Sequence, residues 1–339
     1  MRRIAPTLAL ALVLAAAGTA ASAPGAPAAP VSEPPPDVVQ QVYSPQGVSS
    51  YWTNARITHA KPEHLSAPGA DHSPGTDRSV PRAKRLTPRA DANGYAPWPQ
   101  PYKRDARSRI SGKLVFTSGT DDTQCSASVV RSRSRSLVVT AAHCAWDPEQ
   151  RTWSRNLAFI PGADDRRSRR PYGIWPVTVA AVPRLYMDKG PSEYDVAVLT
   201  VAEGRRGRHV QDVVGAFTPR TTNSSVRFKG FHSLGYPADA PYDGERLMHC
   251  LGNAEPQFPR RPDSTLVTDN CHLYGGNSGG PWIHRTGKGP WEIIGVTSTS
   301  SDYKVKNGNS VAARLLPKTF GVLIRGADQD ARRRAGAEG

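Results

Sequence analysis

Three short motifs in this chain carry the side chains that nucleophilic catalysis requires. His143 lies in the motif TAAHC, directly after an apolar run typical of a β-strand, and Asp195 opens the apolar run YDVAVL. Ser278 lies in the glycine-rich motif GGNSGGP. A serine hydroxyl is a poor nucleophile at neutral pH and needs an adjacent base, a role that suits an imidazole oriented by a buried carboxylate. Together, these side chains predict acyl-transfer chemistry such as peptide hydrolysis.

The glycines around Ser278 fit the same chemistry. They would let the backbone N–H groups of Gly276 and Ser278 converge on the oxyanion that develops during acyl transfer. Each motif also has an ordinary structural interpretation, as a core histidine, a strand cap or a turn. The three motifs occurring together favour catalysis.

The three motifs resemble those of the chymotrypsin-like serine peptidase family. The resemblance rests on TAAHC, YDVAVL and GNSGGP, in the order His, Asp, Ser, and it covers about residues 113–325. It implies that His143 is the general base, Asp195 its orienting acid and Ser278 the nucleophile. Gly276 and Ser278 would then form the oxyanion hole.

The resemblance also implies two supporting features. Ser298, in the motif GVTS, is similar to the serine that supports the aspartate and lines the substrate strand. A disulfide between Cys125 and Cys144 is similar to the one that lies behind the histidine in this family. No cofactor or metal is implied.

Activation is where the sequence departs from the digestive members of the family. Those enzymes carry an aspartate immediately before the nucleophile, where it pairs with the ammonium group released by the activation cleavage. This chain has Asn277, which cannot form that ion pair, so insertion of Ile110 after a cut at Arg109 is not expected. Asn277 and the motif LGYP at residues 234–237 resemble the bacterial secreted glutamyl-endopeptidase branch, in which a pro-segment is removed without this switch.

The substrate pocket is not specified by the motifs. His272, six residues before the nucleophile, replaces the aspartate of trypsin-type members, so a preference for Arg or Lys lacks its counter-charge. Thr297 stands where glutamyl endopeptidases usually have a histidine. His272 and Ser298 are candidate substrate-binding residues, and the specificity stays open.

Short runs rich in β-branched residues dominate from about residue 113 onward, which predicts an all-β fold. The expected fold is two packed antiparallel six-stranded β-barrels with a short C-terminal helix at about residues 312–324, preceded by a largely disordered N-terminal segment. The expected divisions are as follows: a signal peptide at 1–23, a pro-segment or disordered linker at 24–109, a barrel with His and Asp at 110–204, a barrel with Ser at 205–325, and a disordered tail at 326–339.

The N-terminus is typical of an export signal. Two arginines precede a short apolar run, and a small-residue pattern favours cleavage after Ala23. The apolar run is too short to span a membrane, since a span needs about 20 residues. The proline-rich stretch that follows has few apolar runs to offset its ordering entropy, so little fixed structure is expected there before processing. We expect a secreted, extracellular protein.

The chain has four cysteines, and an oxidising compartment favours disulfides over free thiols. Of the three possible connectivities, Cys125–Cys144 with Cys250–Cys271 is favoured because each pair is close in sequence. A zinc site is the alternative, since three His–Cys neighbours occur. Adjacent strand residues point to opposite faces, however, and seldom bind one metal together.

The formal net charge is +15. This charge allows weak polyanion binding through arginine clusters, although a solvated surface is the simpler interpretation, and no motif indicates specific nucleic-acid recognition. The clusters comprise Arg131, Arg133 and Arg135; Arg166, Arg167, Arg169 and Arg170; Arg205, Arg206 and Arg208; and Arg332–Arg334. The leading hypothesis is a monomeric endopeptidase acting on proteins or peptides, and the alternative is an inactive protease-fold protein that binds polyanions.

Overall fold

The computed structural model describes residues 37–63, 83, 86–164, 170–190, 193–222, 226–261, 263–268, 270–300 and 310–337. The predicted signal peptide and its cleavage site lie outside these residues. The side chains of Lys189, Ser300 and Ala337 are likewise not described.

Six antiparallel strands close the first barrel in the order β9, β10, β11, β6, β5, β4 and back to β9. β11 is buried along its whole length because one face points into the barrel and the other is in contact with helix α6 (Phe320–Ala337). The strands are β4 (Ser111–Ser118), β5 (Asp121–Val129), β6 (Leu137–Thr140), β9 (Arg155–Pro161), β10 (Trp175–Pro183) and β11 (Ala197–Val201).

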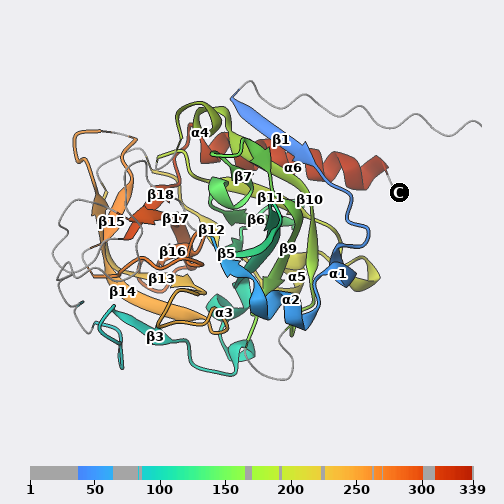
Figure 1. The fold of residues 1–339 in the computed structure, drawn as a ribbon. Coiled ribbons are helices and arrows are strands. Elements are labelled where there is room, and N and C mark those ends of the chain that lie inside the picture. Colours follow the sequence, from blue (N-terminus) through green and yellow to red (C-terminus); the bar gives the residue numbers. More distant parts are fainter. Residues whose placement is uncertain are drawn as a thin grey trace, which may run out of the picture. The chain divides into compact units, whose positions relative to one another are not determined.

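The second barrel closes in the order β13, β14, β15, β18, β17, β16 and back to β13. Its apolar core includes Phe231 and Trp282, whose rings lie 4.4 Å apart between centroids. The prediction of two six-stranded antiparallel barrels is therefore confirmed (Figure 1). The strands are β13 (Phe228–Gly235), β14 (Met248–Pro256), β15 (Leu266–Thr268), β16 (Pro281–His284), β17 (Glu292–Ser300) and β18 (Ser310–Arg314).

Four short strands extend the barrels from outside. β1 (Val38–Val42) pairs with β10 and β3 (Tyr95–Pro97) with β14, both antiparallel; β2 (Lys61–Pro62) pairs with β5 and β12 (Thr218–Pro219) with β17, both parallel. A small ribbon joins β7 (Trp146–Asp147) and β8 (Thr152–Trp153).

The remaining elements are short helices. They are α1 (Val48–Tyr51), α2 (Asn54–His59), α3 (Ala106–Ile110), α4 (Arg184–Lys189) and α5 (Val210–Val214), with the 3-10 turns η1 (Tyr102–Arg104), η2 (Ala142–Cys144) and η3 (Arg205–Gly207). Among the described helices, none is both long and apolar enough to cross a membrane.

The expectation of little fixed structure over residues 24–109 is wrong for the parts that the structure describes. Trp52, Ile57, Trp98 and Tyr102 are buried in the larger apolar core, and Tyr95 is buried in the core of the second barrel. These residues are isolated anchors between prolines and polar residues. Average composition therefore concealed them, although each one buries a large apolar surface.

The C-terminal expectations also need correction. Residues 310–314 form strand β18, and the helix begins at Phe320 and continues through residues expected to be a disordered tail. Phe320, Leu323, Ala327 and Ala331 form a buried stripe at helical spacing, and α6 packs on β11, β10 and β6 of the first barrel (Figure 1). This contact stabilises a helix whose overall composition is polar.

Candidate active site

His143 and Asp195 form a buried hydrogen-bonded pair. Nδ1 of His143 lies 2.8 Å from Oδ2 of Asp195, and the backbone N–H of His143 donates to Oδ1 of the same carboxylate at 3.0 Å. Asp195 is fully buried and His143 is 3% exposed. The histidine lies in η2, which follows β6, and the aspartate lies two residues before β11, so two neighbouring strands of one barrel fix the pair.

The electrostatics of the pair favour an ionised carboxylate. Burial acts to raise the pKa of Asp195, but the charge and hydrogen bond of His143 and a bond from Ser298 outweigh it, so the pKa lies below its usual value. Burial acts to lower the pKa of His143, yet Asp195, with a smaller contribution from Glu63, raises it above 6.5. A carboxylate that remains charged can hold the imidazole in one tautomer and stabilise its protonated form.

Ser298 completes this arrangement from the second barrel. Its hydroxyl donates to Oδ2 of Asp195 at 2.6 Å, and the residue is 1% exposed. A hydrogen bond to a carboxylate is charge-assisted and short. The structure thus brings together His143, Asp195 and Ser298, three of the residues singled out from the sequence.

Ser278 is positioned through backbone contacts. Its carbonyl accepts from the N–H of Ser126 at 2.7 Å, and the N–H of the following Gly279 donates to Thr297 at 2.7 Å. Gly279 has a φ of +76°, and a side chain there would collide with Thr140, three residues before His143. The serine loop therefore packs directly against the segment that carries the histidine.

Nε2 is the ring nitrogen of His143 that Asp195 does not engage. It is buried and has no hydrogen-bond partner among the described residues. Ser278 is 3% exposed. Hydrogen bonds between a catalytic base and its nucleophile are often long before substrate binds. The free nitrogen is thus the atom of the pair on which a proton can be taken up.

The backbone N–H of Gly276 points at a carbonyl from the N-terminal segment. It donates to the oxygen of Glu63 at 3.4 Å. Gly276 has a φ of +87°, and a Cβ there would lie 2.5 Å from the carbonyl oxygen of Tyr236, so only glycine fits. The predicted oxyanion donor is oriented toward an acceptor oxygen.

Asn277, the residue before the nucleophile, is bound by an upstream tyrosine. Its Nδ2 donates to the hydroxyl of Tyr95 at 3.1 Å, and both residues are buried. Ile110 lies in an unbroken helix α3 and is 5% exposed. The side chain directly before Ser278 is thus contacted by a phenol from β3.

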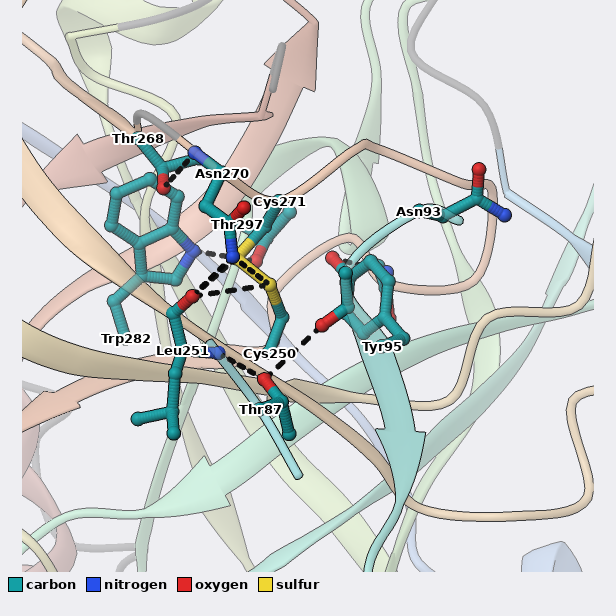
Figure 2. The surroundings of a disulfide bond; sticks show 12 residues. Thr87, Asn93, Tyr95, Cys250, Leu251, Thr268, Asn270, Cys271, Trp282 and Thr297 are labelled. Carbon is teal, nitrogen blue, oxygen red and sulfur yellow. Dashed lines mark hydrogen bonds between the residues drawn. A yellow bond between two sulfur atoms is a disulfide. The ribbon is translucent and has the colours of Figure 1, made fainter. Parts of the chain in front are cut away.

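The disulfide Cys250–Cys271 lies where residues 86–97 pack against the second barrel (Figure 2). Thr87 accepts from the N–H of Leu251 at 2.8 Å, and the N–H of His272 donates to the carbonyl of Asn93 at 3.3 Å. His272 is 5% exposed, so the predicted pocket residue is largely enclosed. The segment around Asn93 therefore lies directly beside His272.

Both cysteine pairs expected from the sequence are present. Cys125–Cys144 joins β5 to η2 directly beside His143, and its two cysteines are separated by 19 positions in the sequence. The sulfur atoms nearest to His143 are therefore in a disulfide and do not offer thiolate ligands, which argues against the zinc interpretation at this position.

Two of the arginine clusters converge on one groove. Arg133, Arg135, Arg332 and Arg334 line a groove of about 490 Å³ between the β5–β6 connection and α6. Arg135 pairs with Asp212 at 3.0 Å and Arg334 with Asp330 at 3.0 Å, so carboxylates neutralise part of this charge. The residues of the cluster at 166–169 lie outside the described part of the chain.

The two barrels and the buried histidine–aspartate pair beside a glycine-rich serine loop define the class of chymotrypsin-like serine endopeptidases. A family model of the trypsin-like peptidase domain matches residues 125–296, half of the chain. The chain therefore belongs to this family. No curated protein matches the sequence.

Solved structures of bacterial and extremophile proteases share the fold. The protease Anisep from Arthrobacter nicotinovorans is 26% identical with a TM-score of 0.55, covering 67% of this chain and 98% of its own. The thermostable serine protease AL20 from an extremophilic microorganism is 28% identical with a TM-score of 0.54, covering 69% and 99%. A Glu endopeptidase at 19% identity has a TM-score of 0.54, covers 70% and 97%, and shows the fold alone.

Sequence reasoning missed two residues that contact the site and a third that holds one of them in place. Glu63 reaches Gly276, the backbone of Gln124 pairs with Glu63, and Tyr95 binds Asn277. The spaced aromatic residues Tyr95, Trp98 and Tyr102, in a stretch otherwise rich in proline, were the available signal, because aromatic side chains seldom recur in a solvated linker.

Proposed function

We propose that the protein hydrolyses peptide bonds with Ser278 as nucleophile, His143 as general base and Asp195 as the orienting acid. The observation that supports this most directly is the hydrogen bond between Nδ1 of His143 and the buried Asp195 carboxylate. This contact fixes the tautomer in which Nδ1 carries the proton and Nε2 can accept one.

The reaction follows from these positions. His143 takes the Ser278 proton as the hydroxyl oxygen attacks the substrate carbonyl, and the imidazolium then protonates the leaving amine. Water next attacks the acyl-enzyme, with His143 again accepting a proton. Backbone N–H groups of Gly276 and Ser278 stabilise the oxyanion, an effect worth about 3–4 kcal/mol for one donor in a comparable hydrolase.

Protein and peptide chains are the proposed substrates, with Ser298 and His272 in the wall that receives them. Ser298 contacts Asp195, and the segment around Asn93 holds the backbone of His272. We also propose that the protein is exported through its N-terminal signal. Two disulfides support this because such bonds persist in oxidising compartments.

Covalent labelling tests the proposal. A fluorophosphonate probe should label the matured wild-type protein on Ser278, and Ser278→Ala should remain unlabelled. Ser111→Ala is the matched control, since it removes a buried hydroxyl from β4 that has no partner among the described residues, and it should label normally. Failure of matured wild-type protein to label or to cleave casein would refute the proposal. Salt-sensitive retention on heparin without labelling would then favour the polyanion-binding alternative.

A further inference from the structure

The segment from Asp37 to Glu63 approaches the candidate active site along the edge of the first barrel. Its end, β2, pairs in parallel with β5, with Lys61 opposite Thr123 and Pro62 opposite Gln124. The N–H of Glu63 donates to the carbonyl of Gln124 at 3.0 Å. Gln124 directly precedes Cys125, whose disulfide reaches the residue next to His143. The backbone of this segment therefore lies beside the catalytic histidine.

The backbone carbonyl of Glu63 accepts a hydrogen bond from a proposed oxyanion donor. Its oxygen accepts the N–H of Gly276 at 3.4 Å, and this N–H is one of the two proposed oxyanion donors. A substrate carbonyl needs the same donor during acyl transfer. The Glu63 carboxylate also lies close enough to His143 to contribute to the raised pKa of the imidazole.

Specific contacts anchor the segment upstream of β2. Asp122, two residues before Gln124, accepts a hydrogen bond from Tyr51 at 2.6 Å and forms an ion pair with Arg56 at 2.6 Å. The indole N–H of Trp52 donates to the carbonyl of Asn156 at 2.6 Å, and Trp52 is fully buried. β1 adds a paired strand along β10. These contacts fix the position of Glu63.

We propose that residues 37–63 are an intramolecular inhibitor that keeps the Gly276 N–H occupied until the segment is displaced. This inference rests on the proposed function of Ser278. The inhibition is steric and electrostatic, because a backbone carbonyl fills the place of the substrate carbonyl. The β1 pairing and the Trp52 anchor do not require a covalent link to the barrels. A cut downstream of Glu63 would therefore leave the segment bound until it dissociates.

A backbone variant tests this proposal on the full secreted chain. Glu63→Pro removes the N–H that donates to Gln124, whereas Glu63→Ala keeps that N–H and removes only the carboxylate. Fluorophosphonate labelling is followed by intact-mass spectrometry, which reads the label and the chain length of each molecule together. Uncut Glu63→Pro should label roughly ten-fold faster than uncut wild type, since losing the backbone bond to Gln124 loosens β2 and so releases the Gly276 N–H from the Glu63 carbonyl. Uncut Glu63→Ala should stay within about three-fold of wild type.

A second variant keeps the test informative if Glu63→Pro does not fold. Arg56→Ala removes the ion pair to Asp122 from within the segment alone, and its uncut form should also label faster than wild type. Equal labelling rates for uncut wild type, Glu63→Pro and Arg56→Ala would overturn the proposal.

Two further outcomes can be distinguished from a failure of the inhibitor proposal in the labelling test. A chain cut after Glu63 in wild type but whole in Ser278→Ala would show that the site treats the segment as substrate, which would also overturn the inhibitor role. If no form labels, including matured protein, the proposed function fails first.

Discussion

The two barrels position their parts of the site by different means. In the first barrel, a side-chain carboxylate is the centre of the arrangement: Asp195 accepts bonds from the ring and the backbone N–H of His143, and a third bond from Ser298 of the second barrel. In the second barrel, backbone groups hold the loop of Ser278 through bonds to Thr297 of the same barrel and to Ser126 of the first barrel. The first arrangement should depend on side-chain chemistry, and the second on backbone conformation. Substitutions that separate these two requirements test the comparison.

Replacement of the carboxylate in the first barrel should have the largest effect. Asp195→Asn keeps the shape of the side chain but removes its charge and allows the wrong tautomer of His143. We expect kcat/KM for a peptide or ester substrate to fall by about 10⁴-fold. The melting temperature, measured in parallel, should show the variant folded. A folded variant that retains a tenth of wild-type activity would contradict the side-chain account.

Backbone conformation can be tested at a glycine of the second barrel. Gly276→Ala places a Cβ 2.5 Å from the carbonyl oxygen of Tyr236 at a φ of +87°. The loop must shift, and losing one oxyanion donor should lower kcat by about 10²–10³-fold.

The matched control for this substitution is Gly173→Ala. Gly173 has a φ of +84° with nothing within 4 Å of its Cβ position, so it carries the same backbone cost without the collision. Its activity should stay near that of wild type. Equal loss in both variants would mean that general strain, and not the oxyanion donor, explains the effect.

Histidines of the two barrels differ in the direction of their pKa shift: the pKa of His143 in the first barrel is raised, whereas two half-buried histidines of the second barrel have a lowered pKa. Burial, reinforced by Arg107 and only partly opposed by Asp105, lowers the pKa of His232 and of His249 to about 4. The unfolded chain binds protons at these residues first, so the free energy of unfolding should fall as pH drops from about 6.5 to about 4. One ring accounts for at most about 3 kcal/mol, with less expected because both rings are partly exposed.

Denaturant unfolding of Ser278→Ala protein at several pH values measures this loss without self-digestion. Adding His232→Gln and His249→Gln should flatten the pH dependence between 6.5 and 4. His59→Gln, at an exposed residue of α2, is the control and should leave the slope unchanged. An unaltered slope in the double variant would assign the acid sensitivity to other groups.

The smallest effect is expected where the two barrels meet. Ser298→Ala removes the second-barrel hydroxyl from the first-barrel carboxylate while His143 still contacts it. A bond to a charged group is worth about 1.5–3 kcal/mol, and partial compensation should leave roughly a ten-fold loss in kcat/KM. Thr299→Ala, one residue further along β17, should have little effect on the same assay. A loss as large as that of Asp195→Asn would mean that Ser298 does more than support the carboxylate.

Much of the fold could be predicted from the sequence because each strand is indicated by its own short run of residues. Runs such as residues 196–199 are rich in β-branched and aliphatic residues, and their burial on a pleated sheet follows from that composition. The contact between His143 and Asp195 was also predictable, since each residue adjoins such a run. Pairing each cysteine with its near neighbour gave the correct disulfides.

The parts that failed depend on long-range packing. Trp52 and Tyr95 are single anchors in proline-rich surroundings, and no local pattern indicates which barrel receives them. The stripe of Phe320, Leu323, Ala327 and Ala331 is visible at helical spacing, but small alanines and a basic end made it look solvated. The contact of Glu63 with Gly276 joins backbone groups, so side-chain identity carries no signal for it.

The contact between Tyr95 and Asn277 has a consequence for alkaline conditions. Here the partners are a carboxamide and a phenol whose pKa burial raises above its usual value of 10. Neither partner changes charge between neutral and moderately alkaline solution, so this contact of the serine loop should persist across that range of pH.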